Sequence, residues 1–132
     1  MTHQFAVRVY YEDTDLAGIV YYANYLKFIE RARSTMVLEA GIDQLEMQAQ
    51  GLVFVVKKVE ANYISSAKLN DDLRIETKLQ QLTGAKITFS QDVYRAGTLI
   101  FSALVTVVCI TNAGKVARFP AKIRAKLDDV SK

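Results

Sequence analysis

Three acidic side chains, Glu12, Asp13 and Asp15, stand together in a short segment that is followed by Gly18. A carboxylate in a loop can act as a general base or as a nucleophile toward a carbonyl carbon. An aspartate beside a glycine also forms turns, because its side chain accepts hydrogen bonds from nearby backbone N–H groups. The residues alone leave both roles open for Asp13 and Asp15.

The acidic segment precedes a long stretch with helical periodicity. Apolar residues recur between Asn24 and Ala40 at the spacing of one helix face, and Gly41 is well placed to end the helix. The first N–H groups of a helix have no partner within the helix, and the helix dipole favours negative charge there. The sequence therefore predicts a carboxylate beside a site that can stabilise an oxyanion.

Aromatic residues are concentrated around the same place, and they support two interpretations. They are Tyr10, Tyr11, Tyr21, Tyr22, Tyr25 and Phe28. The rings either line a pocket for an acyl group or pack the start of the helix. On the helix itself, Glu30 beside Arg31 and Arg33 is expected to be an ion-paired residue.

Several chemistries are disfavoured by what the sequence lacks. The only histidine, His3, falls in an expected N-terminal tail, which argues against a Ser-His-Asp triad, a Cys-His pair or a histidine-rich zinc site. The only cysteine, Cys109, lies in an apolar run and is expected to be a buried strand residue. The six glycines are isolated from one another, so no phosphate-binding glycine loop and no cofactor are expected.

Length and composition predict a single folded domain over residues 1–132. Hydrophobic residues make up 51% of the chain and charged residues 23%, as in ordinary folded proteins. The formal charge of +3 is dispersed, which argues against a nucleic-acid partner and suits a ligand with several phosphates. With no secretory leader at the N-terminus and no apolar run of about 18 residues for a membrane span, a cytoplasmic location is expected.

The other segments predict an α+β fold. Strands are expected over residues 5–10, 52–64, 73–82, 86–94 and 99–110, and short helices over 42–50 and after Pro120. The 99–110 strand is apolar on both faces, which is typical of an interior strand. This order predicts a curved antiparallel sheet of about five strands around one long helix, with one sheet face left uncovered or paired with another subunit.

The segment from Val7 to Arg33 closely resembles the signature of the YbgC-type, 4-hydroxybenzoyl-CoA thioesterase-like hotdog proteins. In this chain it reads VRVYYEDTDLAGIVYYANYLKFIERAR. The resemblance continues at residues 61–64, 70–75 and 118–120, so it spans nearly the whole chain. It implies a hotdog fold and the hydrolysis of an acyl-CoA thioester to a free acid and CoA.

The resemblance also implies roles for particular residues. Asp15, the second aspartate of the D-x-D loop, is the implied catalytic carboxylate, which attacks the carbonyl directly or activates a water. Asp13 is expected to support the loop. The backbone N–H of Tyr22 is the implied oxyanion donor. YbgC-type members commonly carry histidine at this position, so their short-chain preference cannot be transferred to this chain.

Substrate contacts are expected from Gly18, Val20 and Tyr25. Lys86, near the turn at residues 83–85, and Arg95 are candidate contacts for the CoA phosphates. The expected partners are acyl-CoA or an acyl carrier protein, with the chain acting as a homodimer or homotetramer. The alternative function is a non-catalytic hotdog module that binds acyl carrier protein in cell-envelope or lipid metabolism. The presence of Asp15 argues against that alternative.

Overall fold

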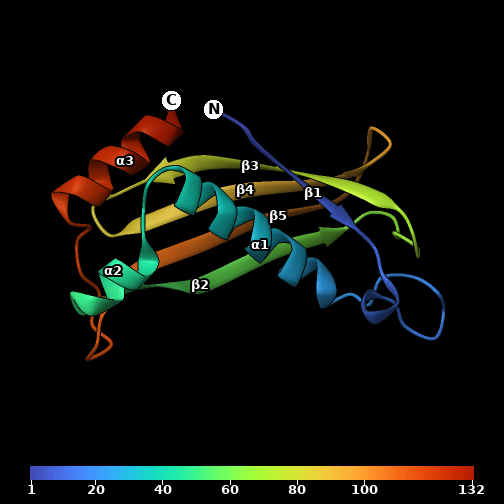
Figure 1. Cartoon of the computed structure of the whole chain (residues 1–132), viewed down its shortest axis with the longest axis horizontal. Helices are drawn as coiled ribbons and strands as arrows, with labels where there is room; N and C mark the ends of the chain where they lie inside the picture. The colour runs from blue at the N-terminus through green and yellow to red at the C-terminus, as the bar shows by residue number, and fades with distance from the viewer.

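The computed structural model describes residues 1–132 and consists of a five-stranded antiparallel sheet crossed on one face by a long helix (Figure 1). The strands are β1 (His3–Arg8), β2 (Leu52–Tyr63), β3 (Asp72–Leu82), β4 (Lys86–Arg95) and β5 (Thr98–Thr111), in the order β1-β3-β4-β5-β2. The helices are α1 (Asn24–Glu39), α2 (Gln44–Ala49) and α3 (Ala121–Ser131), with a 3-10 turn η1 (Tyr11–Asp13). The predicted α+β hotdog architecture is confirmed.

Helix α1 buries an apolar stripe against the sheet. The buried apolar side chains of the stripe are Tyr25, Phe28, Ile29, Ala32, Met36 and Val37. Facing them, alternate residues of β3, β4 and β5 form the other half of the core. The period of 3.6 in the helix and of two in the strands is what brings these two apolar surfaces together.

A polar network in the core fixes α1 on the sheet. The fully buried Gln91 side chain donates to the Ile29 carbonyl at 2.8 Å and to the Thr77 hydroxyl at 3.0 Å. Its amide oxygen accepts from the Arg33 guanidinium at 2.9 Å. An unpaired buried amide costs about 1–3 kcal/mol, so these three bonds favour one position of the helix over others.

Strand β5 lies between β4 and β2, which confirms the prediction of an interior strand. Cys109 on this strand is fully buried, as predicted, and burial raises the pKa of its thiol. The outer strand β2 pairs with β5 along one edge, and its other edge has no partner strand in this chain. Val56 and Val59 of β2 remain exposed.

Gly41 ends α1 as predicted, and Ala96 and Gly97 form the β4–β5 hairpin. Gly41 follows α1 with a φ of 88°, a left-handed conformation that residues other than glycine rarely adopt. In the hairpin, Ala96 and Gly97 have φ values of 49° and 83°, as a tight two-residue turn requires. Pro120 precedes α3, which packs Leu127 into the core.

Three local predictions were wrong. Strand β1 ends at Arg8 instead of residue 10, because Val9 exchanges backbone hydrogen bonds with residues 70 and 71 while the chain turns into η1. His3 lies within β1 rather than in a tail, with its Nε2 3.1 Å from the Glu39 carboxylate. Glu30 forms no ion pair, and it accepts a hydrogen bond from Ser34 at 3.3 Å.

No helix of the chain combines the length and the apolar character that crossing a membrane requires.

Candidate active site

The loop that carries Asp15 is a tight turn closed by backbone hydrogen bonds. The Asp15 N–H donates to the Ile19 carbonyl at 2.9 Å, and the Gly18 N–H donates to the Asp15 carbonyl at 3.0 Å. Gly18 has a φ of 80°, which the turn needs and which explains the glycine at this position. Thr14 and Val20 bridge the two ends of the turn. Asp15 therefore occupies a defined position at the start of the turn.

Asp13 joins this loop to the start of α1. Its carboxylate is buried and accepts the Tyr10 N–H at 2.9 Å. Its carbonyl accepts both the Tyr21 N–H and the Asn24 side-chain amide, each at 2.9 Å. The expectation that Asp13 supports the loop agrees with these contacts, and its carboxylate is not available to a substrate.

The Asp15 carboxylate is exposed and forms one hydrogen bond. Its Oδ1 accepts the Ala17 N–H at 2.9 Å, and its Oδ2 has no partner within the protein. The sequence left open whether Asp15 forms a turn or faces a substrate. The geometry permits both, because one carboxylate oxygen is enough for the turn.

A distant segment, residues 65–68, supports the other side of the loop. The Val20 N–H donates to the Ala67 carbonyl at 2.9 Å, and Ile19 forms a bridge with Lys68. The Ala67 N–H in turn donates to the Tyr25 hydroxyl at 3.0 Å. The loop is thus held between the 65–68 segment and α1.

Arg95 holds that supporting segment in place. Its guanidinium donates to the Ser66 carbonyl and lies 3.7 Å from the Asp71 carboxylate. The Asp71 carboxylate also accepts the Lys68 N–H at 2.8 Å. Arg95, predicted as a contact for phosphates, is therefore already committed to contacts within the protein.

A cleft of about 330 Å³ opens between the loop, the start of α1 and the end of β2. Its lining is mainly apolar and aromatic, with Asp15 as its only charged residue. The lining residues are Asp15, Ile19, Val20, Tyr21, Tyr22, Tyr25, Tyr63, Ile64, Ser65 and Ser66. A site of this character suits an apolar acyl group whose reacting carbonyl lies near one carboxylate.

Several backbone donors at the start of α1 have no acceptor in the protein. The N–H groups of Tyr22, Ala23 and Tyr25 form no hydrogen bond, whereas that of Asn24 donates to the Tyr21 carbonyl at 2.8 Å. These free N–H groups and the positive end of the helix dipole favour a negatively charged oxygen at this place. Tyr22 lies in the cleft lining together with Asp15.

The aromatic cluster divides between the two roles that the sequence left open. Tyr25 is buried, and its ring stacks on Phe101 with centroids 4.9 Å apart and an interplanar angle of 9°. Phe28 is fully buried below it, 6.1 Å from the Tyr25 ring. Tyr22 and Tyr63 are exposed and lie in the cleft wall. The first two rings pack the helix start, and the last two are accessible to a ligand.

Sequence reasoning missed Tyr63. This residue ends β2, and its hydroxyl donates to the Tyr22 carbonyl at 2.9 Å. The two residues are 41 positions apart, and no local pattern marks one strand tyrosine as a partner of the helix start. The family resemblance at residues 61–64 includes Tyr63, but it gave this residue no role.

The other predicted substrate contacts differ in their positions. Val20 and Tyr25 line the cleft, both largely buried, whereas Gly18 shapes the turn without lining the cleft. Lys86 begins β4 at the far end of the sheet, since strand pairing places residue 72 beside Arg8 and residue 82 beside residue 87. The structure therefore does not bring Lys86 and Asp15 together within one chain.

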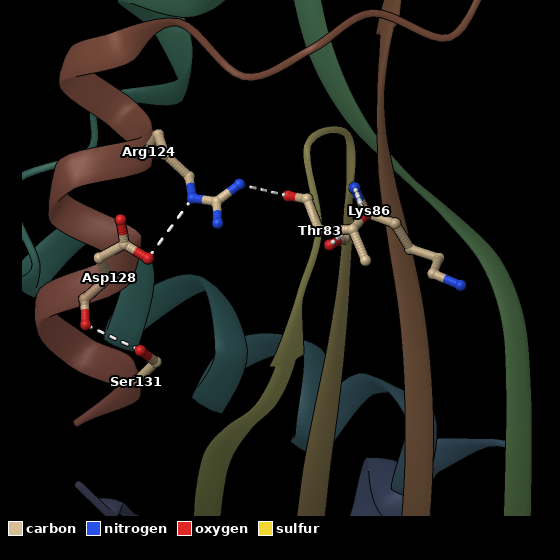
Figure 2. A network of polar contacts seen from close by, with 5 residues as sticks. All are labelled: Thr83, Lys86, Arg124, Asp128 and Ser131. Atoms are coloured by element: carbon tan, nitrogen blue, oxygen red, sulfur yellow. Dashed lines mark hydrogen bonds and ion pairs between the residues drawn. The ribbon is translucent and has the colours of Figure 1, made fainter.

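The surroundings of Lys86 are structural. Figure 2 shows the β3–β4 turn held by α3, with the Arg124 guanidinium donating to the Thr83 carbonyl at 2.9 Å. The Thr83 N–H donates to the Lys86 carbonyl at 2.8 Å, and the Lys86 N–H donates to the Thr83 hydroxyl at 3.1 Å. The Lys86 ammonium points away from Arg124 (Figure 2). This ammonium forms no hydrogen bond or ion pair within the chain.

The comparisons with known proteins agree with this geometry. The sequence matches the model of the Thioesterase-like superfamily over residues 9–127. The acyl-CoA thioesterase YbgC of Haemophilus influenzae is 41% identical over 124 residues, which cover 92% of this chain and 90% of that protein.

Solved structures show the same likeness. A probable thioesterase from Bartonella henselae superposes with a TM-score of 0.85 at 34% identity, covering 91% of this chain and 100% of that one. A 1,4-dihydroxy-2-naphthoyl-CoA thioesterase from Synechocystis shares the fold, with a TM-score of 0.91 at 20% identity and coverage of 100% and 99%. The chain therefore belongs to the thioesterase-like superfamily, where it groups with the YbgC-type acyl-CoA thioesterases.

Proposed function

We propose that this protein hydrolyses acyl-CoA thioesters to a free acid and CoA, with Asp15 as the catalytic carboxylate and the Tyr22 N–H as the oxyanion donor. One observation carries the assignment of these residues. Asp15 and Tyr22 line the same cleft, the first with a carboxylate oxygen that has no partner and the second with an N–H that has no acceptor. A carbonyl placed between them meets a base or nucleophile on one side and a hydrogen-bond donor on the other.

Two routes use this arrangement. In the first, the free oxygen of Asp15 attacks the thioester carbonyl carbon, the C–S bond breaks, and a water then hydrolyses the mixed anhydride. In the second, Asp15 removes a proton from a water that attacks the carbonyl directly. In both routes the Tyr22 N–H stabilises the oxygen that becomes negative, and CoA leaves as a thiolate. A thiol has a pKa near 8.5, so the leaving group is stable enough for a carboxylate to act as the nucleophile.

The character of the cleft supports an acyl group as the part of the substrate that enters. Its walls are mainly aromatic and aliphatic, and Tyr22 brings no titratable imidazole next to the carbonyl. An acyl carrier protein is a second possible thiol carrier for the same chemistry. We propose a homodimer or homotetramer in the cytoplasm as the working form.

The test is a thiol-release assay on the parent, Asp15→Asn and Glu12→Gln. The substrates are CoA thioesters from acetyl to palmitoyl, together with benzoyl and hydroxybenzoyl thioesters. Asparagine keeps an oxygen for the Ala17 N–H, so the turn should survive while at least about a hundredfold of turnover is lost. Glu12 is exposed and forms no side-chain contact, so Glu12→Gln removes a nearby charge and should leave turnover within about twofold of the parent.

Each outcome of this assay decides a different point. Turnover that depends on Asp15 but not on Glu12 supports the proposal, and the preferred thioester identifies the acyl class. Parent-like turnover by Asp15→Asn would make the residue assignment wrong while leaving the reaction intact. A parent that hydrolyses no CoA ester would favour the non-catalytic or carrier-protein-binding module.

A further inference from the structure

Tyr63 forms a contact with the helix start that is unlike any other in the site. Its hydroxyl donates to the Tyr22 carbonyl at 2.9 Å, and no other side chain forms a hydrogen bond with the backbone of residues 21–23. No backbone N–H donates to that carbonyl either, because the Leu26 N–H donates to the Ala23 carbonyl at 3.2 Å. The Tyr22 carbonyl is therefore held by Tyr63 alone.

This carbonyl belongs to the peptide group that joins Tyr22 to Ala23. Because a peptide group is planar, fixing its oxygen also fixes the direction of the Ala23 N–H on the opposite side. A hydrogen bond to the oxygen further polarises the N–H of the same group. The neighbouring peptide, which carries the Tyr22 N–H, is fixed at its own oxygen by the Asn24 N–H at 2.8 Å.

The ring of Tyr63 is itself held in place by other rings. Its centroid lies 5.1 Å from that of Phe101 and 5.6 Å from that of Tyr25, both in edge-on arrangements. Tyr25 and Phe101 are buried and stacked on each other. The hydroxyl therefore connects a ring packed against the core to the segment that precedes α1.

We propose that Tyr63 is a positioning residue, whose hydroxyl fixes the Tyr22–Ala23 peptide and so orients the free Ala23 N–H, next to the Tyr22 N–H, toward the thioester oxygen. This inference rests on the proposed function, and it gives a role to a residue to which the family resemblance assigned none. Tyr63 touches the acyl group only through its ring, while its hydroxyl acts through the backbone. The two parts of the side chain can therefore be separated by substitution.

Burial against the neighbouring rings raises the pKa of the Tyr63 phenol, with smaller contributions from Tyr22 and Tyr25. The hydroxyl consequently stays protonated across the neutral pH range, as a hydrogen-bond donor must.

The experiment compares Tyr63→Phe, Tyr63→Leu and Tyr94→Phe in steady-state hydrolysis of the best CoA thioester. Tyr63→Phe keeps the ring contacts, so kcat should fall about tenfold, the value of one lost hydrogen bond, with KM within about twofold. Tyr63→Leu should show the same fall in kcat and a raised KM, because the ring lines the cleft. Tyr94 is a strand tyrosine whose hydroxyl forms no hydrogen bond, and Tyr94→Phe should match the parent.

A second measurement does not depend on activity. The heteronuclear ¹H–¹⁵N NOE of the Ala23 amide should fall in Tyr63→Phe. Its chemical shift should also change, because the carbonyl of the same peptide group loses its hydrogen-bond donor. Neither should change in Tyr94→Phe.

Parent-like kcat in Tyr63→Phe, or a change in KM alone, would overturn the inference in favour of a simple acyl contact. Unchanged mobility of the Ala23 amide would overturn it as well. If the parent hydrolyses no thioester, the proposed function fails, and the NMR comparison still decides whether Tyr63 orders the helix start.

Discussion

Asp15 accepts the Ala17 N–H at 2.9 Å through one carboxylate oxygen, and this bond leaves the second oxygen free at the edge of the cleft. The turn-forming role and the proposed catalytic role therefore belong to different atoms of one side chain. Because the turn bond fixes one oxygen, it also restricts where the other can point. The same bond makes the structural role of Asp15 separable from its chemistry.

Asp15→Asn and Asp15→Ala should differ in stability although both lose turnover. Asparagine retains an oxygen for the Ala17 N–H, whereas alanine leaves the turn without this bond at a cost of about 1 kcal/mol. Denaturant unfolding of both variants and the parent measures the difference. Equal stability of the two variants would mean that the Ala17 bond contributes nothing in solution.

Gly18→Ala should lower activity as well as stability, and Gly114→Ala provides a matched control. Gly18 and Gly114 have φ values of 80° and 81°, and a Cβ at either position would meet no atom within 4 Å. Backbone strain is then the main cost, about 1 kcal/mol in each case. Thermal unfolding should show similar losses, while only Gly18→Ala should reduce kcat. A loss of kcat in both variants would contradict a local effect on the turn.

Tyr22→Phe should retain turnover within about threefold, because the proposed donor is a backbone N–H and not the phenol. Tyr22→Ala should also keep kcat within about tenfold while raising KM, since it removes a ring from the cleft wall. Steady-state kinetics on one thioester tests both variants. A loss of more than about a hundredfold in Tyr22→Phe would show that the hydroxyl takes part in the reaction.

Asp92→Asn should stabilise the protein at neutral pH. Burial, and after it the Glu76 carboxylate directly across β3, raises the pKa of Asp92, while Lys78 partly offsets the rise. A carboxyl pKa that is higher in the folded state means that the protein gains stability as Asp92 is protonated and loses it as pH rises through that pKa.

The substitution removes this destabilisation. It should raise the free energy of unfolding at pH 7 by about 0.5 kcal/mol, the size expected for a like-charge pair across two strands. Urea unfolding from pH 7 down to the ordinary carboxyl range should show the stability advantage of Asp92→Asn over the parent shrinking as pH falls. Asp129→Asn on α3, where the carboxylate is exposed and unpaired, controls for the change in net charge. Identical pH profiles of stability in the parent and Asp92→Asn would contradict the raised pKa of Asp92.

Cys109 should not react with a disulfide reagent in the folded protein. The thiol is fully buried in β5, and burial raises its pKa, so little thiolate is exposed to the reagent. The folded protein should release no colour, and the unfolded protein should titrate one thiol. Cys109→Ala should keep kcat. This result would also show that the thiol-release assay detects the thiol of CoA and not that of the protein.

Much of the fold follows from local pattern. The helix period over residues 24–40 and the alternation in the strands depend on neighbours within a few positions, and the structure confirms both. The prediction that β5 is interior was possible because a strand that is apolar on both faces is typical of the middle of a sheet, and β5 lies between β4 and β2. The family resemblance is confirmed by the superfamily match over residues 9–127.

The contacts that complete the site could not be predicted, because they join segments far apart in the sequence. Tyr63 reaches Tyr22 over 41 positions, and Ala67 reaches Tyr25 over 42. His3 was placed in a tail because two residues before a strand carry too little pattern to extend it. Lys86 was chosen for its charge beside a turn, and only the strand register places it at the far end of the sheet.

The free donors at the start of α1 have a consequence for how this protein can diverge. The N–H groups of Tyr22, Ala23 and Tyr25 belong to the backbone, and every amino acid except proline carries one. Side chains at these positions can therefore change size and polarity without deleting the donor. If these donors stabilise the oxyanion as proposed, acyl preference can change by mutation while that stabilisation is inherited unchanged.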